Sequence, residues 1–197
     1  NKLCELANYV DVRGSKCVMD IPAFAKYKGE DYPVTRIGYY AFNEDNAPDA
    51  VNFLNATNLE EIGDWAFYKC CFNSNNLPND NLDLSHTKLR RIGRHAFQDS
   101  ESTNPDINVD WDNIIFPGTI QIIDDYAFEG VNVNHKLRFT SNDDNMIKNL
   151  KLGKNWIKRP PFYNAIQGMG LLCTPSNKKY LNLNKAFENN RCGWMMD

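Results

Sequence analysis

A short apolar pattern recurs along this chain at nearly constant spacing, and it limits the possible folds more than any other feature. The pattern is apolar-x-x-Ile-Gly-x-x-Ala-Phe, and its four gapless copies span residues 34–42, 59–67, 89–97 and 120–128. Their alanines stand at 41, 66, 96 and 127, so the steps are 25, 30 and 31 residues. Two further steps reach a degenerate copy at 152–157 and the pair Ala186-Phe187. Self-similarity at such a period indicates a solenoid, because chance similarity within an α/β domain does not produce this many copies.

A second apolar segment precedes each copy, with two inward positions on either side of one outward position. The segments are 19–21, 51–53, 82–84, 114–116, 137–139 and 171–173. Such short alternation predicts one strand per coil, and these strands should lie side by side as a parallel sheet, about 4.8 Å apart. We expect the Ile-Gly-x-x-Ala-Phe segment to form a tight bend. Its Gly would supply an unusual backbone angle or a close approach, Ala would allow close packing, and Phe would fill the space between coils.

The fourth copy has Asp124 where the other copies have Gly. We expect Asp to serve there because it tolerates the left-handed backbone region.

The repeat closely resembles the BspA-like leucine-rich repeats, whose units have the form L-x-x-I-x-L-P-x-x-L-x-x-I-G-x-x-A-F-x-x-C. Residues 114–128 match the second half of this unit, and residues 59–70 match the remainder, including its terminal Cys. The resemblance covers roughly residues 17–190, where inserted loops lengthen the family's usual period of about 23 residues to about 30. It implies a leucine-rich-repeat right-handed superhelix of about six coils, with short parallel strands on the concave face and tight bends and short helical turns elsewhere.

We therefore expect residues 1–197 to form a single domain, with caps at both ends because a terminal coil would otherwise expose its apolar face. Residues 1–16 form the predicted N-terminal cap, with a strand at 9–12, and residues 17–190 form the repeats. A Cys4–Cys17 disulfide would fasten this cap if the protein is exported. The predicted C-terminal cap is 191–197, whose apolar 194–196 covers a final coil or continues into a neighbouring domain.

Composition excludes several classes of function. The net charge of −3 argues against a nucleic-acid binder that relies on bulk positive charge. No apolar run reaches the ~18 residues of a membrane span. The three histidines are scattered and there is no C-x-x-C spacing, so we expect no metal site. Phosphate-binding, dinucleotide and nucleophile-elbow motifs are missing too, so we expect no cofactor. The 27 asparagines suit repeated turns, because Asn bonds its own backbone and accepts positive φ.

Two rows of side chains are candidates for ligand binding. The first is the outward position at each strand centre, on the concave sheet that leucine-rich repeats usually use for ligands: Asp20, Asn52, Asp83, Ile115, Arg138 and Leu172. The acidic and polar first half suits a basic or hydroxyl-rich partner. The alternative is a solvated strand face with no ligand. Asp20 and Asp83 would lie ~10 Å apart, which is near the carboxylate spacing of inverting glycosidases. Nothing else in the sequence supports an enzyme.

The second row is the position just before each Ala: Tyr40, Trp65, His95 and Tyr126. Stacked coils would place these rings in a ladder, which is either mutual packing or a platform for sugars or a protein partner. Cys70 stands at a position that holds Asp45, Ser100 and Val131 in other copies, and this variation favours a buried slot for small residues over a reactive thiol. The tripeptide Asn55-Ala-Thr57 matches the glycosylation pattern.

Together these observations predict a non-catalytic binding or adhesion module that mediates protein–protein interaction through a repeat-lined surface. The alternatives are a carbohydrate-binding surface built on the aromatic ladder and a structural spacer of a larger cell-surface protein. The resemblance implies a secreted or surface protein, mostly bacterial, with a host or matrix protein or a glycan as ligand. We expect an extracellular monomer, exported with or without a lipid anchor in a segment outside this chain.

Overall fold

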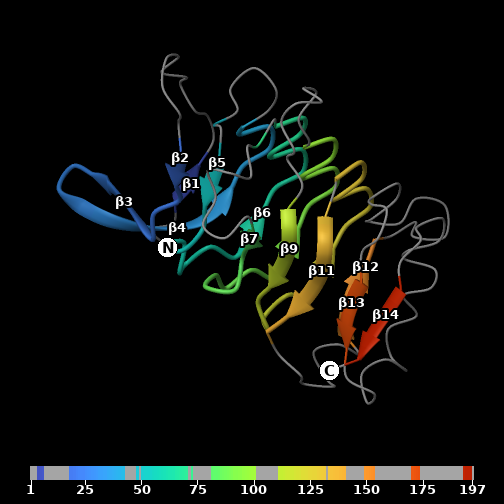
Figure 1. The fold of residues 1–197 in the computed structure, drawn as a ribbon. Helices are drawn as coiled ribbons and strands as arrows, with labels where there is room; N and C mark the ends of the chain where they lie inside the picture. The colour runs from blue at the N-terminus through green and yellow to red at the C-terminus, as the bar shows by residue number, and fades with distance from the viewer. Residues whose placement is uncertain are drawn as a thin grey trace.

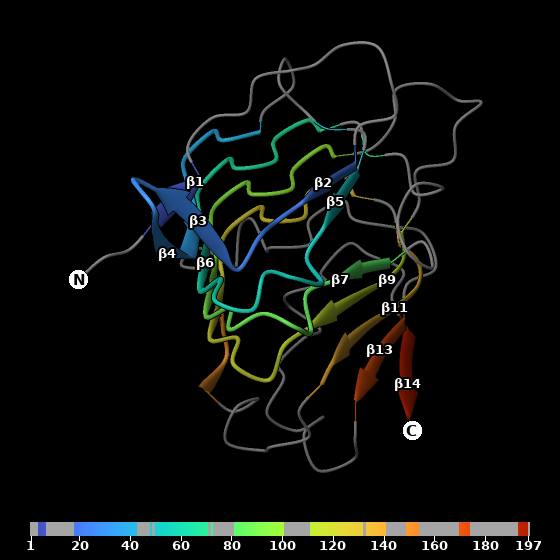
Figure 2. The ribbon, with the colours of Figure 1, turned by 90° about the vertical axis from the view of Figure 1, so that its left-hand side faces the viewer.

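The computed structural model describes a stack of β-coils. The described residues are 4–6, 18–42, 48, 50–70, 72, 81–100, 111–131, 133–140, 149–153, 170–173 and 193–196. Every element with defined bounds among them is a strand, and the strands follow one another from β1 and β2 at one end of the stack to β14 at the other (Figure 1). The view along the stack shows the coils nested behind one another, with strands on two opposite sides (Figure 2). The predicted leucine-rich-repeat solenoid is confirmed as a parallel β-solenoid, and the elements of the described residues include no helix where short helical turns were expected.

We call one of these sides face A. Its strands are β2 (Val18–Asp20), β5 (Ala50–Asn52), β7 (Asn81–Asp83), β9 (Trp111–Phe116), β11 (Val133–Phe139), β13 (Gly170–Cys173) and β14 (Gly193–Met196). The first six are the strands expected from the short alternating segments, whereas β14 was not predicted as a strand, and all their pairings are parallel. The strands do not form one continuous sheet, however: β2 and β5 form a two-stranded sheet, whereas β7 to β14 form a five-stranded one.

The opposite side, face B, is a second parallel sheet that the sequence analysis did not predict. Its strands are β1 (Cys4–Leu6), β4 (Glu30–Ile37), β6 (Glu61–Ile62), β8 (Arg91–Ile92), β10 (Ile122–Ile123) and β12 (Lys151–Leu152). The Ile of each repeat, which we expected in a bend, pairs with the Ile of the next coil. The register continues to Leu152, which lies opposite Ile123 in the degenerate fifth copy. Each coil therefore has two strands, and the bend begins one residue later than expected.

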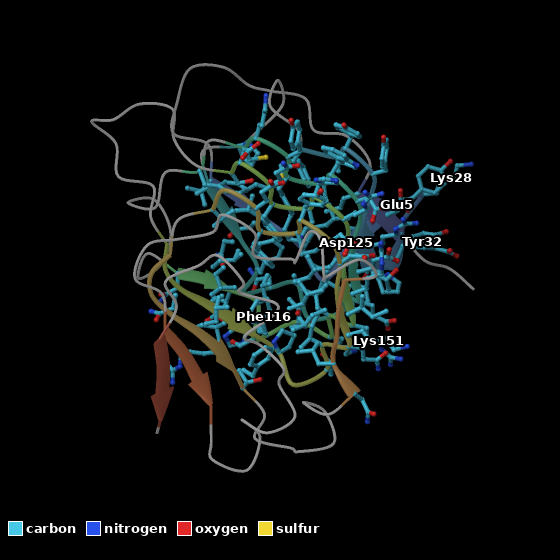
Figure 3. All side chains as sticks on the ribbon, turned by 90° about the vertical axis from the view of Figure 1, so that its right-hand side faces the viewer. Glu5, Lys28, Tyr32, Phe116, Asp125 and Lys151 are labelled. Atoms are coloured by element: carbon cyan, nitrogen blue, oxygen red, sulfur yellow. The ribbon has the colours of Figure 1, made fainter. Side chains whose placement is uncertain are left out.

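A β-hairpin projects from the first coils (Figure 1). Its strands are β3 (Phe24–Tyr27) and the first half of β4, paired antiparallel, and its turn places Lys28 and Gly29 at positive φ. Figure 3 shows Lys28 and Tyr32 in this projection, beyond the body of the stack. The hairpin interrupts the spacing between the first strand segment and its Ile-Gly motif, which explains why the repeat pattern alone did not predict it.

The core lies between the two faces and contains a ladder of repeat phenylalanines. Phe42, Phe67, Phe97 and Phe128 stack on one another with ring centroids 5.2, 5.0 and 5.1 Å apart and nearly parallel planes. Phe116 meets Phe128 edge-on from face A at 5.8 Å, and Figure 3 shows it in the interior. The alanine before each ladder phenylalanine is fully buried. Phe therefore fills the space between coils, as the sequence indicated.

Gly63 and Gly93, of the second and third copies, are needed for close approach and not for an unusual backbone angle, whereas Gly153 of the degenerate fifth copy has a φ of +68°. A Cβ on Gly63 would lie 2.8 Å from the Ile37 carbonyl oxygen, and one on Gly93 would lie 2.6 Å from the Asp64 nitrogen. The described positive-φ positions do not include Asp124 or these glycines; the residue at positive φ in the fourth copy is Tyr126, at 58°. Our explanation of Asp124 through the left-handed region was therefore wrong.

The structure corrects one expectation about the ends of the stack. Cys4 is a free cysteine, so the proposed Cys4–Cys17 disulfide is not formed. Residues 4–6, assigned to a cap, pair with β4 as the first strand of face B, and β14 adds an outer strand to face A within the predicted C-terminal cap. The predicted strand at 9–12, residues 156–157 of the fifth copy and the sixth copy at Ala186 lie outside the described residues.

Candidate functional site

Face A carries the first candidate row in two groups. Asp20 lies opposite Asn52 across the β2–β5 pair. Asp83, Ile115 and Arg138 lie opposite one another across β7, β9 and β11. Leu172 is on β13, the next strand of that sheet, and its side chain is outside the described part of the structure. The sheet register thus brings neighbours of the predicted row together, but the row is divided between two sheets.

Several polar groups of this row bond to the protein itself. Asn52 Nδ2 donates to Asp20 Oδ1 at 2.7 Å. The side-chain oxygens of Asn52 and Asp83 each accept from the backbone N–H two residues later, at 3.0 and 2.9 Å, which closes the turn after each strand. Asp20 and Arg138 are exposed, whereas Ile115 is half-buried. The row therefore presents a carboxylate in one sheet and a guanidinium in the other, on backbones fixed by strand pairing.

A second polar pair on face A was missed by the sequence analysis. Asn113 Nδ2 donates to Asn81 Oδ1 at 2.8 Å across β7 and β9. Both residues are half-buried and lie two positions before Asp83 and Ile115, on the same side of their strands. Side chains two residues apart lie on the same side of a strand, so the outward position two residues before Asp83 and Ile115 identifies this pair. We considered only one outward position on each strand.

The second candidate row forms a continuous stack of rings along the bends. Tyr40 and Trp65 are 5.6 Å apart, Trp65 and His95 3.8 Å, and His95 and Tyr126 4.6 Å, with interplanar angles of 4°, 19° and 13°. All four residues have positive φ, between 53° and 60°. With this left-handed backbone, the N–H groups of Tyr40, Trp65 and His95 bond to the next coil, as Trp65 does to the Arg94 carbonyl at 2.9 Å. Tyr39 and Tyr68 pack edge-on against this stack, and the sequence analysis did not include either of them.

His95 is held in the middle of the stack. Its Nδ1 donates to Gln98 Oε1 at 2.5 Å, and Gln98 Nε2 donates in turn to Glu129 Oε2 at 2.6 Å. Burial lowers the pKa of His95, and the positive charge of Arg94 lowers it further, which together outweigh the hydrogen bond to Gln98. The imidazole is therefore favoured in its neutral form, which suits a packed ring better than an acid–base catalyst.

Whether this ladder can bind a sugar depends on which ring faces are uncovered. A sugar stacks on the face of an aromatic ring, but both faces of Trp65 and of His95 are covered by neighbouring rings. Only ring edges of these two residues remain for a ligand. The geometry therefore favours the packing interpretation of the ladder over the sugar platform.

Face B carries a ladder of alternating charges that the sequence analysis did not identify. Arg36 lies between Glu5 and Glu61, with N···O distances of 3.3 and 3.6 Å. Arg91 bonds Glu61 at 2.7 Å, Asp64 at 2.6 Å and Asp124 at 3.1 Å. Figure 3 shows Glu5 and Lys151, from the first and last strands of this sheet, on its outer side. The sequence signal was the residue before the repeat Ile in the first three copies, where the charge alternates from Arg36 to Glu61 to Arg91.

Arg91 and Asp64 stabilise each other in their charged forms. Burial alone would raise the pKa of Asp64, but the hydrogen bonds from Arg91 and from the Arg94 backbone N–H lower it below its usual value. Burial would likewise lower the pKa of Arg91, and its three carboxylate partners raise it instead. The arrangement is a satisfied ion-pair network, and among the described residues there is no group of His, Cys, Asp or Glu that could hold a metal ion.

The small-residue slot predicted at Cys70 is confirmed, since Cys70, Ser100 and Val131 are each at most 2% exposed. The Cys70 thiol donates to the carbonyl of Phe42, and the Ser100 hydroxyl donates to the carbonyl of Phe67 at 2.5 Å. Each donor thus satisfies the carbonyl of the ladder phenylalanine one coil earlier, which is a structural use of both side chains.

The two-stranded coil, the phenylalanine ladder and this slot are a regular repeat unit, and family comparison agrees. The model of the BspA type leucine-rich repeat region matches six copies, over residues 30–104 and 106–152, which is more than half of the chain. The chain belongs to the BspA-type leucine-rich repeat family. BspA-type repeats are generally found on bacterial cell-surface proteins, act in protein interaction and are typically non-enzymatic. Comparison with curated proteins and with solved structures finds no match. No helix among the described residues of this BspA-type chain is long and apolar enough to span a membrane.

Proposed function

We propose that this chain is a non-catalytic adhesion module of an exported protein, and that it binds a protein partner through the strand-centre row of face A. The row comprises Asp20, Asn52, Asp83, Ile115, Arg138 and Leu172. The observation that carries the proposal is the fixed spacing within each of the two groups of this row, because parallel pairing places Asp20 one strand from Asn52 and Ile115 one strand from both Asp83 and Arg138. A flat or extended partner can then contact several coils at once, so that affinity comes from many weak contacts.

The sign of the exposed charge changes along the proposed binding surface. Asp20 is exposed at the β2 end, and Arg138 is exposed on β11 farther along the stack. A partner that carries basic groups at one end and acidic groups at the other would be oriented by this row. Face B supports the choice of face A, because its residues Arg36, Glu61 and Arg91 already form ion pairs with carboxylates or guanidinium groups of this chain.

The test is binding of the chain to immobilised extracellular-matrix proteins, measured by surface plasmon resonance. The Asp83→Arg substitution reverses one charge at the centre of the row and should weaken binding at least tenfold. It also removes the bond from the Ser85 N–H, so it should lower stability by about 1 kcal/mol while the chain remains folded at the assay temperature. Glu60→Arg is the matched control, because it makes the same charge change at an exposed residue outside the row and should bind like the wild type.

Equal weakening by Asp83→Arg and Glu60→Arg would count against face A as the binding surface. If the wild type binds no matrix protein, the adhesion proposal fails and the structural-spacer alternative is favoured.

A further inference from the structure

One turn on the stack exposes two polar side chains on either side of a buried residue. Asn55-Ala56-Thr57 is the one Asn-x-Ser/Thr tripeptide in the sequence, and it lies in the turn that follows β5. The side chains of Asn55 and Thr57 are exposed, while Ala56 between them is fully buried. Backbone bonds from Ala56 N to Phe53 O (3.0 Å) and from Thr57 N to Asn55 O (2.9 Å) fix the turn. The turn is thus anchored by its backbone and its apolar residue, and both polar side chains point to solvent.

Neighbouring asparagines differ from Asn55 in how they use their amides. Asn52 donates to Asp20 and accepts from Leu54 N. Asn58 donates to the Ala23 carbonyl and accepts from Lys88 Nζ, both at 3.1 Å. The Asn55 amide makes no hydrogen bond with the described residues. A group attached to Asn55 would therefore break no contact of the described fold, whereas the same change at Asn52 or Asn58 would.

We propose that Asn55 is an acceptor for N-linked glycosylation, with the Thr57 hydroxyl as the recognition group two residues later. The donor is an oligosaccharide on a lipid pyrophosphate. A bond forms between Asn55 Nδ2 and the anomeric carbon, the bond from that carbon to the pyrophosphate oxygen breaks, and one amide proton is released as the lipid pyrophosphate leaves. The glycan would stand at the edge of face A beside Leu54, which is 52% exposed, and would cover this apolar side chain.

The test uses the full chain, directed by a signal peptide into the secretory pathway of cultured insect cells. We expect one glycan per chain, seen as a single size step that peptide N-glycosidase removes with conversion of Asn55 to Asp in the tryptic peptide. The variants Asn55→Gln and Thr57→Ala should lose the step, and Thr57→Ser should keep it because the hydroxyl remains. All three should unfold at the wild-type temperature, since neither side chain supports the described fold.

The peptide is analysed in both the secreted chains and those retained inside the pathway, so that poor secretion still gives a result. An unmodified Asn55 in both fractions would overturn the proposal, as would a size step that persists in Asn55→Gln.

Discussion

At the scale of single residues, the repeat depends on how closely adjacent coils approach beside each Gly. At Gly63 and Gly93 the backbone of the previous coil occupies the place where a Cβ would stand. The fourth copy has Asp124 at this position. Its backbone N–H still donates to the Ile92 carbonyl at 2.9 Å, and its carboxylate accepts a hydrogen bond from Arg91. The repeat Gly is therefore a packing requirement, and its replacement comes with a charged partner.

Gly93→Ala should destabilise the protein by about 1–3 kcal/mol, the usual cost of forcing extra atoms into a packed site. The added methyl would lie 2.6 Å from backbone atoms of Gly63 and Asp64, which cannot rotate away. Urea unfolding followed by circular dichroism measures the loss. Gly29→Ala is the control: it has φ +80° but nothing within 4 Å, so it should cost only about 1 kcal/mol of backbone strain. Equal losses for the two variants would contradict the close-approach explanation.

Arg91→Gln should cost about 1–3 kcal/mol at neutral pH, because three carboxylates lose a charged hydrogen-bond donor. The folded pKa of Asp64 lies below its unfolded value, so this contribution is present above the unfolded value of 3.8 and is lost as pH falls through the folded pKa. The stability gap between wild type and variant should therefore narrow as pH falls below about 4.

Thermal unfolding at a series of pH values measures this gap. Arg90→Gln, at the exposed neighbouring position, should change stability by less than about 0.5 kcal/mol throughout. A gap between wild type and Arg91→Gln that does not change with pH would show that the ion pairs are not its source.

At the scale of elements, the sequence predicted the strands of face A and the phenylalanine ladder, because each depends on a pattern repeated in every coil. Face B was not predicted, since a two-residue strand such as Arg91–Ile92 has no alternation to recognise and its pairing depends on the neighbouring coil. The hairpin of β3 with β4 occurs only once, so no repeat signalled it. The aromatic row was found by position, but the stacking of its rings required the left-handed backbone that only the structure shows.

Trp65→Ala separates the two interpretations of the aromatic ladder. If the rings are packing elements, the variant should lose about 2 kcal/mol of stability, less than a fully buried Trp because Trp65 is half-buried. Tyr39→Ala, at a ring that is 63% exposed, should lose much less. Chemical denaturation measures both, and a glycan array provides the second readout. Unchanged stability with abolished glycan binding in Trp65→Ala would instead support a sugar platform.

At the scale of the whole molecule, the chain is a stack with two sides of different character. Face B pairs its charges internally from Glu5 to Asp124, whereas face A leaves Asp20 and Arg138 exposed on fixed strands. The family model matches six copies between residues 30 and 152, a stretch that contains the four gapless copies of the sequence pattern. The division of face A into two sheets could not be predicted, because the same short alternation of apolar and polar residues occurs in both sheets.

The most direct test of the proposed binding surface is a hydrogen–deuterium exchange footprint of the chain with a bound extracellular-matrix protein. Binding through face A predicts slower exchange at 18–20, 50–52, 81–83, 113–116 and 137–139, with little change at 36–37, 61–62, 91–92 and 122–123. Protection confined to the face B strands, or to the bends that carry Tyr40, Trp65, His95 and Tyr126, would contradict it.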